Sequence, residues 1–206
     1  MSGRSANDPR NDPRNDPRNG SRNAMERFER LAWPEMAVML RAAKFLTRRD
    51  DQAEDLAQET MLKAMRAMDR FIDGSDIKAW LMTILRRTHI DRLRAAQRRG
   101  VEQALPSEVE DDRPPAGRYD DYFRGEPEQL MNRLDDETVI EAMRQLPDEI
   151  RWTLLLVDVE RMDHAEAATV LGVPVGTIKS RAHRGRAMLR DRLYAQAPER
   201  FKRNKP

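Results

Sequence analysis

Apolar residues recur at helical spacing in two stretches of the chain, from about residue 28 to 97 and from about 127 to 195. One early set fits a single helix face: Met36, Met39, Leu40, Ala43 and Leu46. Asp51 followed by Glu54 predicts a capping box that opens a second helix. That helix would bury Leu56, Ala57, Thr60, Met61, Ala64, Met65 and Met68. After a loop over 71–76, a third helix is expected from about Ile77, with Trp80, Leu81, Ile84 and Leu85 inward.

The second stretch contains stronger boundary signals. Pro147 suits the first turn of a helix, which would bury Ile150, Leu154, Leu155 and Val157. Asp163 and Glu166 predict another capping box, and Gly172 predicts the C-terminal cap of that short helix. Pro174 starts a further helix, with Ile178, Ala182 and Leu189 inward. A short apolar helix, a glycine turn and a second helix with a polar outer face predict a helix-turn-helix over 165–184.

The remaining segments have no pattern of burial. Asn7-Asp8-Pro9-Arg10 is repeated at 11–14 and 15–18, and proline at every fourth residue argues against a helix, so residues 1–24 are expected to be a disordered tail. Residues 100–126 read as a flexible acidic linker, and residues 196–206 as a basic tail. The predicted fold is therefore all-α, with two small helical domains at 25–99 and 127–195.

Composition excludes several classes of protein. The 206 residues include 39% hydrophobic and 5% aromatic residues, few for a sandwich or barrel, and no cysteine, which removes disulfides, thiolate metal sites and a cysteine nucleophile. No apolar run approaches the roughly 18 residues of a membrane-spanning helix, and no signal-peptide core is present. We expect a soluble, cytoplasmic protein.

A net charge of only +2 conceals strong segregation. Residues 86–99 carry six Arg and one Asp, and residues 176–192 carry five Arg, one Lys and one Asp, a balance of +5 in each block. Between them, residues 101–137 carry twelve acidic residues against four Arg, a balance of −8. Two basic helices indicate two contacts with a polyanion such as nucleic acid. The alternative is that both helices present ordinary solvated faces.

The helix-turn-helix is the most specific of these signals. Its second helix would enter the major groove, where arginine suits a bidentate contact with guanine. Gly176 and Thr177 lie in the first turn, where free backbone N–H groups can meet a phosphate. The outward polar residues are Lys179, Ser180, Arg181, His183 and Arg184. The alternative is a plain helical hairpin with a basic exterior.

Taken together, the motifs resemble the extracytoplasmic-function (ECF) subfamily of bacterial RNA polymerase sigma factors over about residues 28–193. In the first unit the resemblance rests on the sequences DQAEDLAQET at 51–60, AWL at 79–81 and IDRLR at 90–94. In the second unit it rests on LP at 146–147 and PVGTIKSR at 174–181. It implies a factor that binds core RNA polymerase, recognises and melts promoter DNA, and has an anti-sigma factor as a partner.

The resemblance assigns roles in the first unit. The helix over 54–68 would dock on the polymerase clamp through Asp55, Gln58 and Glu59, for which a merely solvated face is the alternative. The minus-ten element would be held by Asp73, Ser75, Arg86, Arg87, Arg94 and Arg98, with Arg99 adding a backbone contact. Arg87 stands where asparagine is common in the family, which leaves the identity of the captured base open. Trp80 is expected to belong to the core rather than to stack on a base.

In the second unit, the resemblance places the minus-thirty-five contacts at Thr177, Lys179, Ser180, Arg181, His183 and Arg184. Ser180, His183 and Arg184 would face base edges, while Lys179 and Arg181 would lie toward the backbone. The acidic linker resembles the family's connector through polymerase, and ordinary linker acidity is the alternative.

Sequence patterns argue against an enzyme. His89, His164 and His183 have no paired spacing for zinc, and neither a phosphate loop nor a nucleophile elbow is present. We therefore expect no catalytic residues, no metal, no cofactor and no small-molecule substrate. The competing hypothesis is a stand-alone helix-turn-helix regulator, which would normally need a dimer seam.

Overall fold

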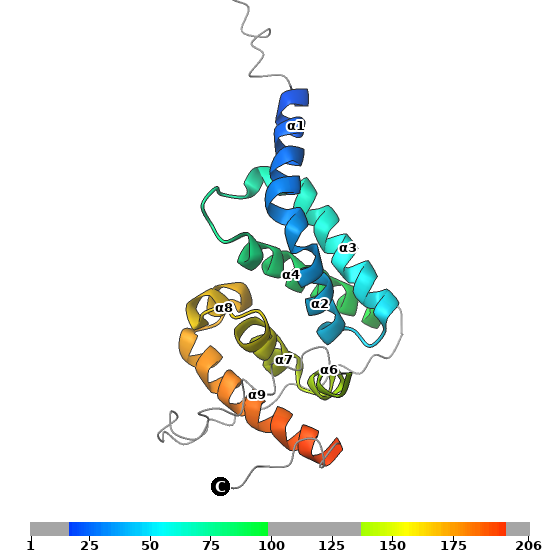
Figure 1. The fold of residues 1–206 in the computed structure, drawn as a ribbon, viewed down its shortest axis with the longest axis vertical. Helices are drawn as coiled ribbons and strands as arrows, with labels where there is room; N and C mark the ends of the chain where they lie inside the picture. Colours follow the sequence, from blue (N-terminus) through cyan, green and yellow to red (C-terminus); the bar gives the residue numbers. More distant parts are fainter. Residues whose placement is uncertain (1–16, 99–136, 197–206) are drawn as a thin grey trace, which may run out of the picture.

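The computed structural model describes residues 17–98 and 137–196, and both ranges are helical apart from short turns (Figure 1). Within them there is no β-strand, which confirms the all-α prediction. The α-helices are α1 (Pro17–Arg27), α2 (Met36–Leu46), α3 (Asp50–Arg66), α4 (Ile77–Arg98), α6 (Glu137–Arg144), α7 (Asp148–Leu154), α8 (His164–Leu171) and α9 (Val175–Gln196). Shorter helical turns cover Phe28–Ala32, Trp33–Glu35, Met68–Arg70 and Leu155–Val159.

The N-terminal bundle consists of α1 to α4, in which α3 packs against both α2 and α4. Its interior is built from the positions that the helical spacing predicts. The buried apolar residues include Met39, Ala43, Leu46, Leu56, Ala57, Met61, Ala64, Met68, Leu81 and Leu85. Met65, Trp80 and Ile84 are only partly buried against this core. Trp80 packs its ring 5.2 Å from that of Phe71, so its placement at the edge of the core agrees with the expected packing role.

Two local predictions for this bundle were wrong. Residues 17–24 belong to α1 rather than to a helix-free tail. The last repeat proline, Pro17, stands at the first helical position, where a missing N–H and a fixed φ are tolerated. The capping box at Asp51 and Glu54 does not form either: α3 begins at Asp50, and the Asp51 carboxylate instead binds Arg49 at 2.6 Å. The Arg49 guanidinium hydrogen bond lowers the pKa of Asp51.

The C-terminal bundle consists of α6 to α9, with Trp152, Leu154 and Leu155 fully enclosed. Pro147 is the N-cap of α7 rather than a first-turn residue, because its ψ of 142° is not helical. Gly185 permits the close approach of α9 to α7. A Cβ built there would lie 2.7 Å from Ile150 Cγ2, closer than real Cβ atoms come, and a tight 3.0 Å from Leu154.

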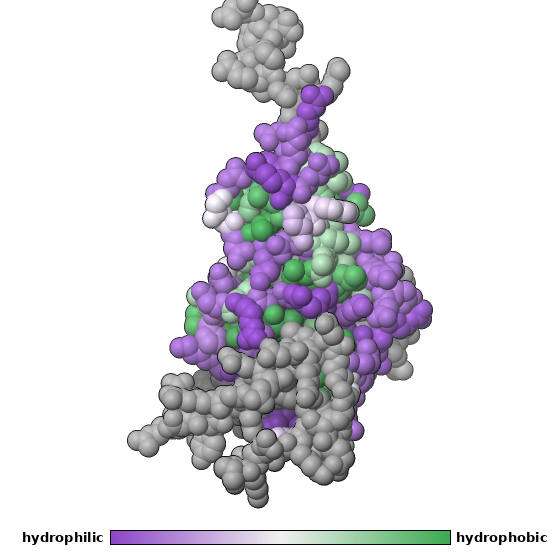
Figure 2. Space-filling view, viewed as in Figure 1, coloured by the Kyte–Doolittle hydropathy of each residue, from purple (hydrophilic) through white to green (hydrophobic). Residues whose placement is uncertain are grey.

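The two bundles touch each other: α2 packs against α6, and α4 packs against α8. Figure 1 shows α1 and α9 at opposite ends of this assembly. On the face shown in Figure 2, hydrophilic residues dominate the coloured part of the surface, with smaller hydrophobic areas between them. The predicted linker at 100–126, Arg99, the repeats before residue 17 and the basic tail from 197 lie outside the described residues. The domain boundaries at 25–99 and 127–195 stay predictions.

Candidate polymerase and nucleic-acid interfaces

One face of α3 presents polar side chains to solvent. Asp55 and Gln58 are exposed, and Leu62, one turn further on, is 49% exposed. Their spacing of three and four residues places them on a single stripe. The exposed leucine at the end of this stripe adds an apolar side chain beside the polar ones, and protein interfaces combine both kinds.

Glu59, the third predicted polymerase residue, is partly engaged within the chain. Its carboxylate binds Arg92 of α4 at 2.7 Å and Lys63 at 2.9 Å. Partial burial raises the pKa of Glu59, but hydrogen bonds from Lys63 and Arg92 outweigh this and lower the pKa overall. Arg92 also donates to the backbone carbonyl of Asp55 at 2.8 Å. Glu59 therefore fixes α4 against α3, and its neighbours Asp55 and Gln58 are freer to meet a partner.

The loop over 71–76 is held in place from several sides. Arg27 of α1 donates to the Phe71 carbonyl at 2.8 Å and to the Asp73 carboxylate at 2.7 Å. Ser75 Oγ donates to the Ile72 carbonyl at 2.5 Å, and Gly74 takes a φ of +86°, which favours glycine. Asp76 then caps α4 by accepting from the N–H groups of Lys78 and Ala79 at 2.7 and 3.1 Å.

The loop also exposes an apolar side chain that sequence reasoning missed. Ile72 is 76% exposed at the start of the loop, next to the predicted residues Asp73 and Ser75. The sequence does contain a signal for it, because Ile72 follows the buried Phe71 and precedes four residues that are polar or glycine. Apolar side chains of this kind can insert beside unstacked bases.

The predicted arginines of α4 lie along the helix rather than around one pocket. Arg87, Arg94 and Arg98 are exposed and spaced by seven and four residues, so they share one face. Arg86 is half-buried and lies to one side of that stripe. None of the four makes an ion pair with another residue that the structure describes. Because α4 is about 33 Å long, the loop residues lie at one end of a track and Arg98 at the other.

The helix-turn-helix forms as predicted from α8 and α9. Asp163 and Glu166 make the reciprocal capping box, with Asp163 Oδ1 accepting from Ala165 N at 2.7 Å. Gly172 closes α8 with a φ of 68°, and the Val173 N–H donates to the Ala168 carbonyl at 3.1 Å. Both local signals were therefore correct.

The six predicted residues of α9 fall into two groups. Lys179 and Arg184 are exposed, whereas Thr177, Ser180, Arg181 and His183 are half-buried. Ser180 Oγ donates to the Thr177 carbonyl at 3.0 Å, and Arg181 is ion-paired with Glu149 of α7. A DNA contact by Arg181 would therefore require it to exchange a carboxylate for a phosphate.

A further arginine of the basic block, Arg186, has a structural role. It binds the buried carboxylate of Asp158 in bidentate fashion, at 2.6 and 3.1 Å. Asp158 is only 8% exposed at its side chain, so this pair lies largely out of water. Sequence spacing does not reveal this contact, because the two residues are 28 positions apart.

The chain is similar in sequence to known bacterial sigma factors. Residues 36–99 match Sigma-70 region 2, and residues 136–189 match Sigma-70 region 4. The ECF RNA polymerase sigma factor EcfG of Rhodopseudomonas palustris is 37% identical over 151 residues, which cover 73% of this chain and 76% of that protein. SigE of Mycolicibacterium smegmatis is 34% identical over 178 residues, 85% of this chain and 65% of that protein.

A solved structure agrees with these matches. The sigma factor RpoE of Bartonella quintana, in complex with the anti-sigma factor NepR, is 30% identical and superimposes with a TM-score of 0.62. The match covers 81% of this chain and 96% of that one. In the described ranges, no helix is long and apolar enough to cross a membrane. The chain belongs to the ECF family of bacterial RNA polymerase sigma factors.

Proposed function

We propose that region 2 and region 4 of this sigma factor divide promoter recognition between α4 and α9, while α3 binds core polymerase. The observation that carries this assignment is the exposed arginine stripe of α4, formed by Arg87, Arg94 and Arg98, in a chain that also carries a helix-turn-helix. A helix-turn-helix regulator needs no second basic helix of this kind, so the stand-alone regulator is the weaker hypothesis.

In this assignment the two DNA contacts differ in kind. The α4 stripe would hold the separated strand through its phosphates, with the loop over 71–76 beside the extruded base. Asp73 and Ser75 would line that loop, and Arg86 would add charge at its side. On α9, Ser180, His183 and Arg184 would face base edges, with Thr177, Lys179 and Arg181 toward the backbone.

Binding alone is sufficient for this role. The protein would contribute free energy of association and strand capture, while polymerase supplies the chemistry of RNA synthesis, so we assign no catalytic residue, cofactor or metal to the chain. It would act in the cytoplasm, on core polymerase and promoter DNA. An anti-sigma factor is a further partner that we propose, since the Bartonella quintana relative was solved with one.

Run-off transcription tests the proposal. Purified bacterial core polymerase with this protein should initiate at specific promoters, whereas a repressor or activator would not enable initiation. Asp55→Ala with Gln58→Ala should weaken polymerase binding without loss of helicity, because both side chains are exposed. Glu29→Ala, at another exposed acidic position of the N-terminal bundle, serves as the matched control. Wild-type yield of holoenzyme from the double variant would contradict the assignment of the α3 face.

A further inference from the structure

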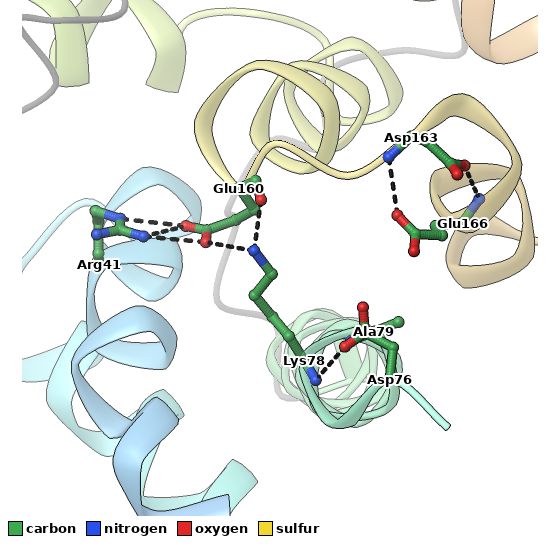
Figure 3. Close-up of polar contacts among 7 residues, drawn as sticks. All are labelled: Arg41, Asp76, Lys78, Ala79, Glu160, Asp163 and Glu166. Carbon is green, nitrogen blue, oxygen red and sulfur yellow. Dashed lines mark hydrogen bonds and ion pairs between the residues drawn. The ribbon is translucent and has the colours of Figure 1, made fainter. Parts of the chain in front are cut away.

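A single buried carboxylate joins region 4 to region 2. Glu160 has a side chain only 1% exposed, and it lies between Arg41 of α2 and Lys78 of α4 (Figure 3). Arg41 Nη2 donates to both carboxylate oxygens, at 2.9 and 3.0 Å. Lys78 Nζ donates to the Glu160 backbone carbonyl at 2.5 Å and lies 3.9 Å from the carboxylate. These three residues are called the Glu160 clasp below.

The local backbone holds Glu160 in this position. It directly follows the π-helical turn Leu155–Val159, and its N–H donates to the Leu155 carbonyl at 2.9 Å. The next residue, Arg161, has a φ of 57°, a left-handed conformation that costs free energy for any residue other than glycine. The capping box at Asp163 then fixes the start of α8 (Figure 3). The carboxylate is therefore presented by a constrained segment, not by a flexible loop.

Other contacts surround the clasp and depend on the same closure. Arg144 of α6 donates to the Lys44 carbonyl of α2 at 3.0 Å. The ring of His89 on α4 lies 6.1 Å from that of Trp152 on α7. His89 Nε2 also lies 3.9 Å from the Asp148 carboxylate of α7. Among the described residues, Glu160 is the only carboxylate that lies within 3 Å of a cation from the other bundle, Arg41.

The chemistry of the clasp makes closure conditional. A carboxylate moved out of water is tolerated only while its cationic partners remain in place. Burial raises the pKa of Glu160, and the hydrogen bond and charge of Arg41 oppose that rise. Removal of either cation leaves the buried carboxylate incompletely compensated, which the chain can relieve by separating its two regions.

The closed arrangement conflicts with simultaneous promoter contact. Elements centred near minus ten and minus thirty-five are about 25 base pairs apart, or about 85 Å along B-DNA. Compact units of about 80 and 60 residues have diameters near 30 and 27 Å, so two that touch span at most about 60 Å. In addition, α8 packs on α4, the helix that we assign to the minus-ten element.

We propose that the Glu160 clasp is an intramolecular docking contact that holds regions 2 and 4 closed, in a state unable to occupy both promoter elements, until polymerase separates them. This inference rests on the proposed division of promoter recognition between α4 and α9. Its energetic consequence is that polymerase must select the open fraction of the chain. Opening the clasp should therefore tighten the apparent affinity for polymerase, about tenfold if one chain in ten is open at the outset.

Pulsed electron–electron double resonance, which measures the distance between two spin labels, tests the closure on the full chain. Because the protein has no cysteine, Asp69→Cys in region 2 and Ala195→Cys on α9 provide the only two labelling sites. The wild type should give mainly one short distance, with at most a minor population at longer distance. Glu160→Gln and Arg41→Gln should each enlarge the population at longer distance. The double variant should open no further than the more open single variant, because the residues act as one unit. Glu29→Gln and Arg30→Gln, both exposed, should leave the distance unchanged.

The outcomes separate the inference from the proposed function. Unchanged distances in Arg41→Gln and Glu160→Gln would overturn the clasp. If Glu160→Gln fails to fold, as circular dichroism would show, the half-exposed Arg41 in the other bundle decides the matter by itself. Opening of the variants without tighter polymerase binding would overturn the inhibitory role. Failure of the wild type to support run-off transcription, with normal opening of the variants, would instead overturn the proposed function and leave the contact standing.

Discussion

The two basic helices, α4 and α9, have equal charge surpluses in the sequence but differ in what their arginines contact. On α4, Arg87, Arg94 and Arg98 are exposed and make no ion pair with another described residue. On α9, Arg181 binds Glu149 and Arg186 binds Asp158. Charge counted along a helix therefore overstates what α9 can offer to DNA.

The difference suits two modes of recognition. A row of free cations follows a phosphate backbone and carries no sequence information. A helix whose other arginines are tied to its own bundle is held rigidly, and its few remaining exposed side chains can read bases at fixed positions. The comparison predicts that substitutions on α9 divide into structural and reading effects, whereas substitutions on α4 act mainly through charge.

The largest expected effect belongs to a structural arginine of α9. Arg186→Ala leaves the Asp158 carboxylate, 8% exposed, without its cation. Loss of one partner of a buried pair typically costs about 3–5 kcal/mol. We expect a decrease of that order in the free energy of unfolding, measured by urea titration.

Arg184→Ala is the control on the same helix. Its side chain is exposed, so the free energy of unfolding should change by no more than about 0.5 kcal/mol. If Arg186→Ala and Arg184→Ala had equal free energies of unfolding, the division of the α9 arginines into structural and exposed ones would be wrong.

On α4 the comparison predicts an effect of salt. Arg87→Gln, Arg94→Gln and Arg98→Gln together should reduce the slope of log affinity against log salt by about 2, because each single-strand phosphate contact contributes about 0.7. Between 50 and 200 mM salt, the ratio of wild-type to variant affinity should fall about 20-fold. The measurement is holoenzyme binding to a promoter fragment with a pre-melted minus-ten region.

The matched charge reduction is on α9. Arg181→Gln should change that slope less than one α4 arginine does, since Arg181 is already paired with Glu149. If Arg181→Gln changed the salt slope more than Arg94→Gln alone, the free cations would lie on α9 rather than on α4, against the comparison.

His89, on the buried face of α4, should make the stability of the protein depend on pH. Burial lowers the pKa of His89 from 6.5 to about 4, with a further decrease from Arg151 and Arg92 and an opposing increase from Asp148. Between these two pKa values the unfolded chain binds a proton that the folded chain does not, so stability falls as the pH falls. From pH 7 to pH 5 we expect His89 to contribute a loss of about 2 kcal/mol.

His89→Phe isolates this contribution, because it keeps an aromatic ring beside Trp152 and removes the titration. Urea titrations at pH 7 and pH 5 should therefore show a smaller loss of unfolding free energy in His89→Phe than in the wild type. Glu160 acts in the opposite sense in both proteins, because its raised pKa means that the folded chain takes up a proton first as the pH falls. The same loss in both would show that His89 does not titrate between these pH values.

The sequence predicts those parts of the fold that local physics controls. The capping box at Asp163, the left-handed Gly172 and the buried faces of α2 to α4 depend on residues a few positions apart, and all agree with the structure. The false capping box at Asp51 shows the limit: its residue types fit, but Arg49 competes for the carboxylate.

Contacts between distant segments could not be predicted in this way. Arg27 reaches Asp73 across 46 positions, Arg92 reaches Glu59 across 33, and Arg41 reaches Glu160 across 119. Nothing in the spacing of these residues indicates the pairing, because it depends on how the helices pack. The ion pair of Arg181 could not be predicted for the same reason: as a residue type it suits DNA, and only the fold brings Glu149 to it.

The smallest effects distinguish reading from anchoring on α9. Arg184→Ala should remove one base-edge contact and relax discrimination at one minus-thirty-five base pair by about 1–3 kcal/mol. Lys179→Ala should remove one phosphate contact, weaken all promoters in similar proportion and reduce the salt slope by about one. Both side chains are exposed, so neither substitution should alter folding. The measurement is transcription of a library randomised at the minus-thirty-five element, sequenced for each variant.

Rank order within the library separates the two roles from a general loss of activity. Arg184→Ala should reorder the promoters that differ at one position, whereas Lys179→Ala should preserve their order. Uniform scaling by Arg184→Ala, or reordering by Lys179→Ala, would exchange the two assignments. Reordering by neither would place base reading at Ser180 or His183, which are half-buried near the same turn of α9. In either case the α4 variant should preserve the minus-thirty-five order, because a phosphate track contains no information about sequence.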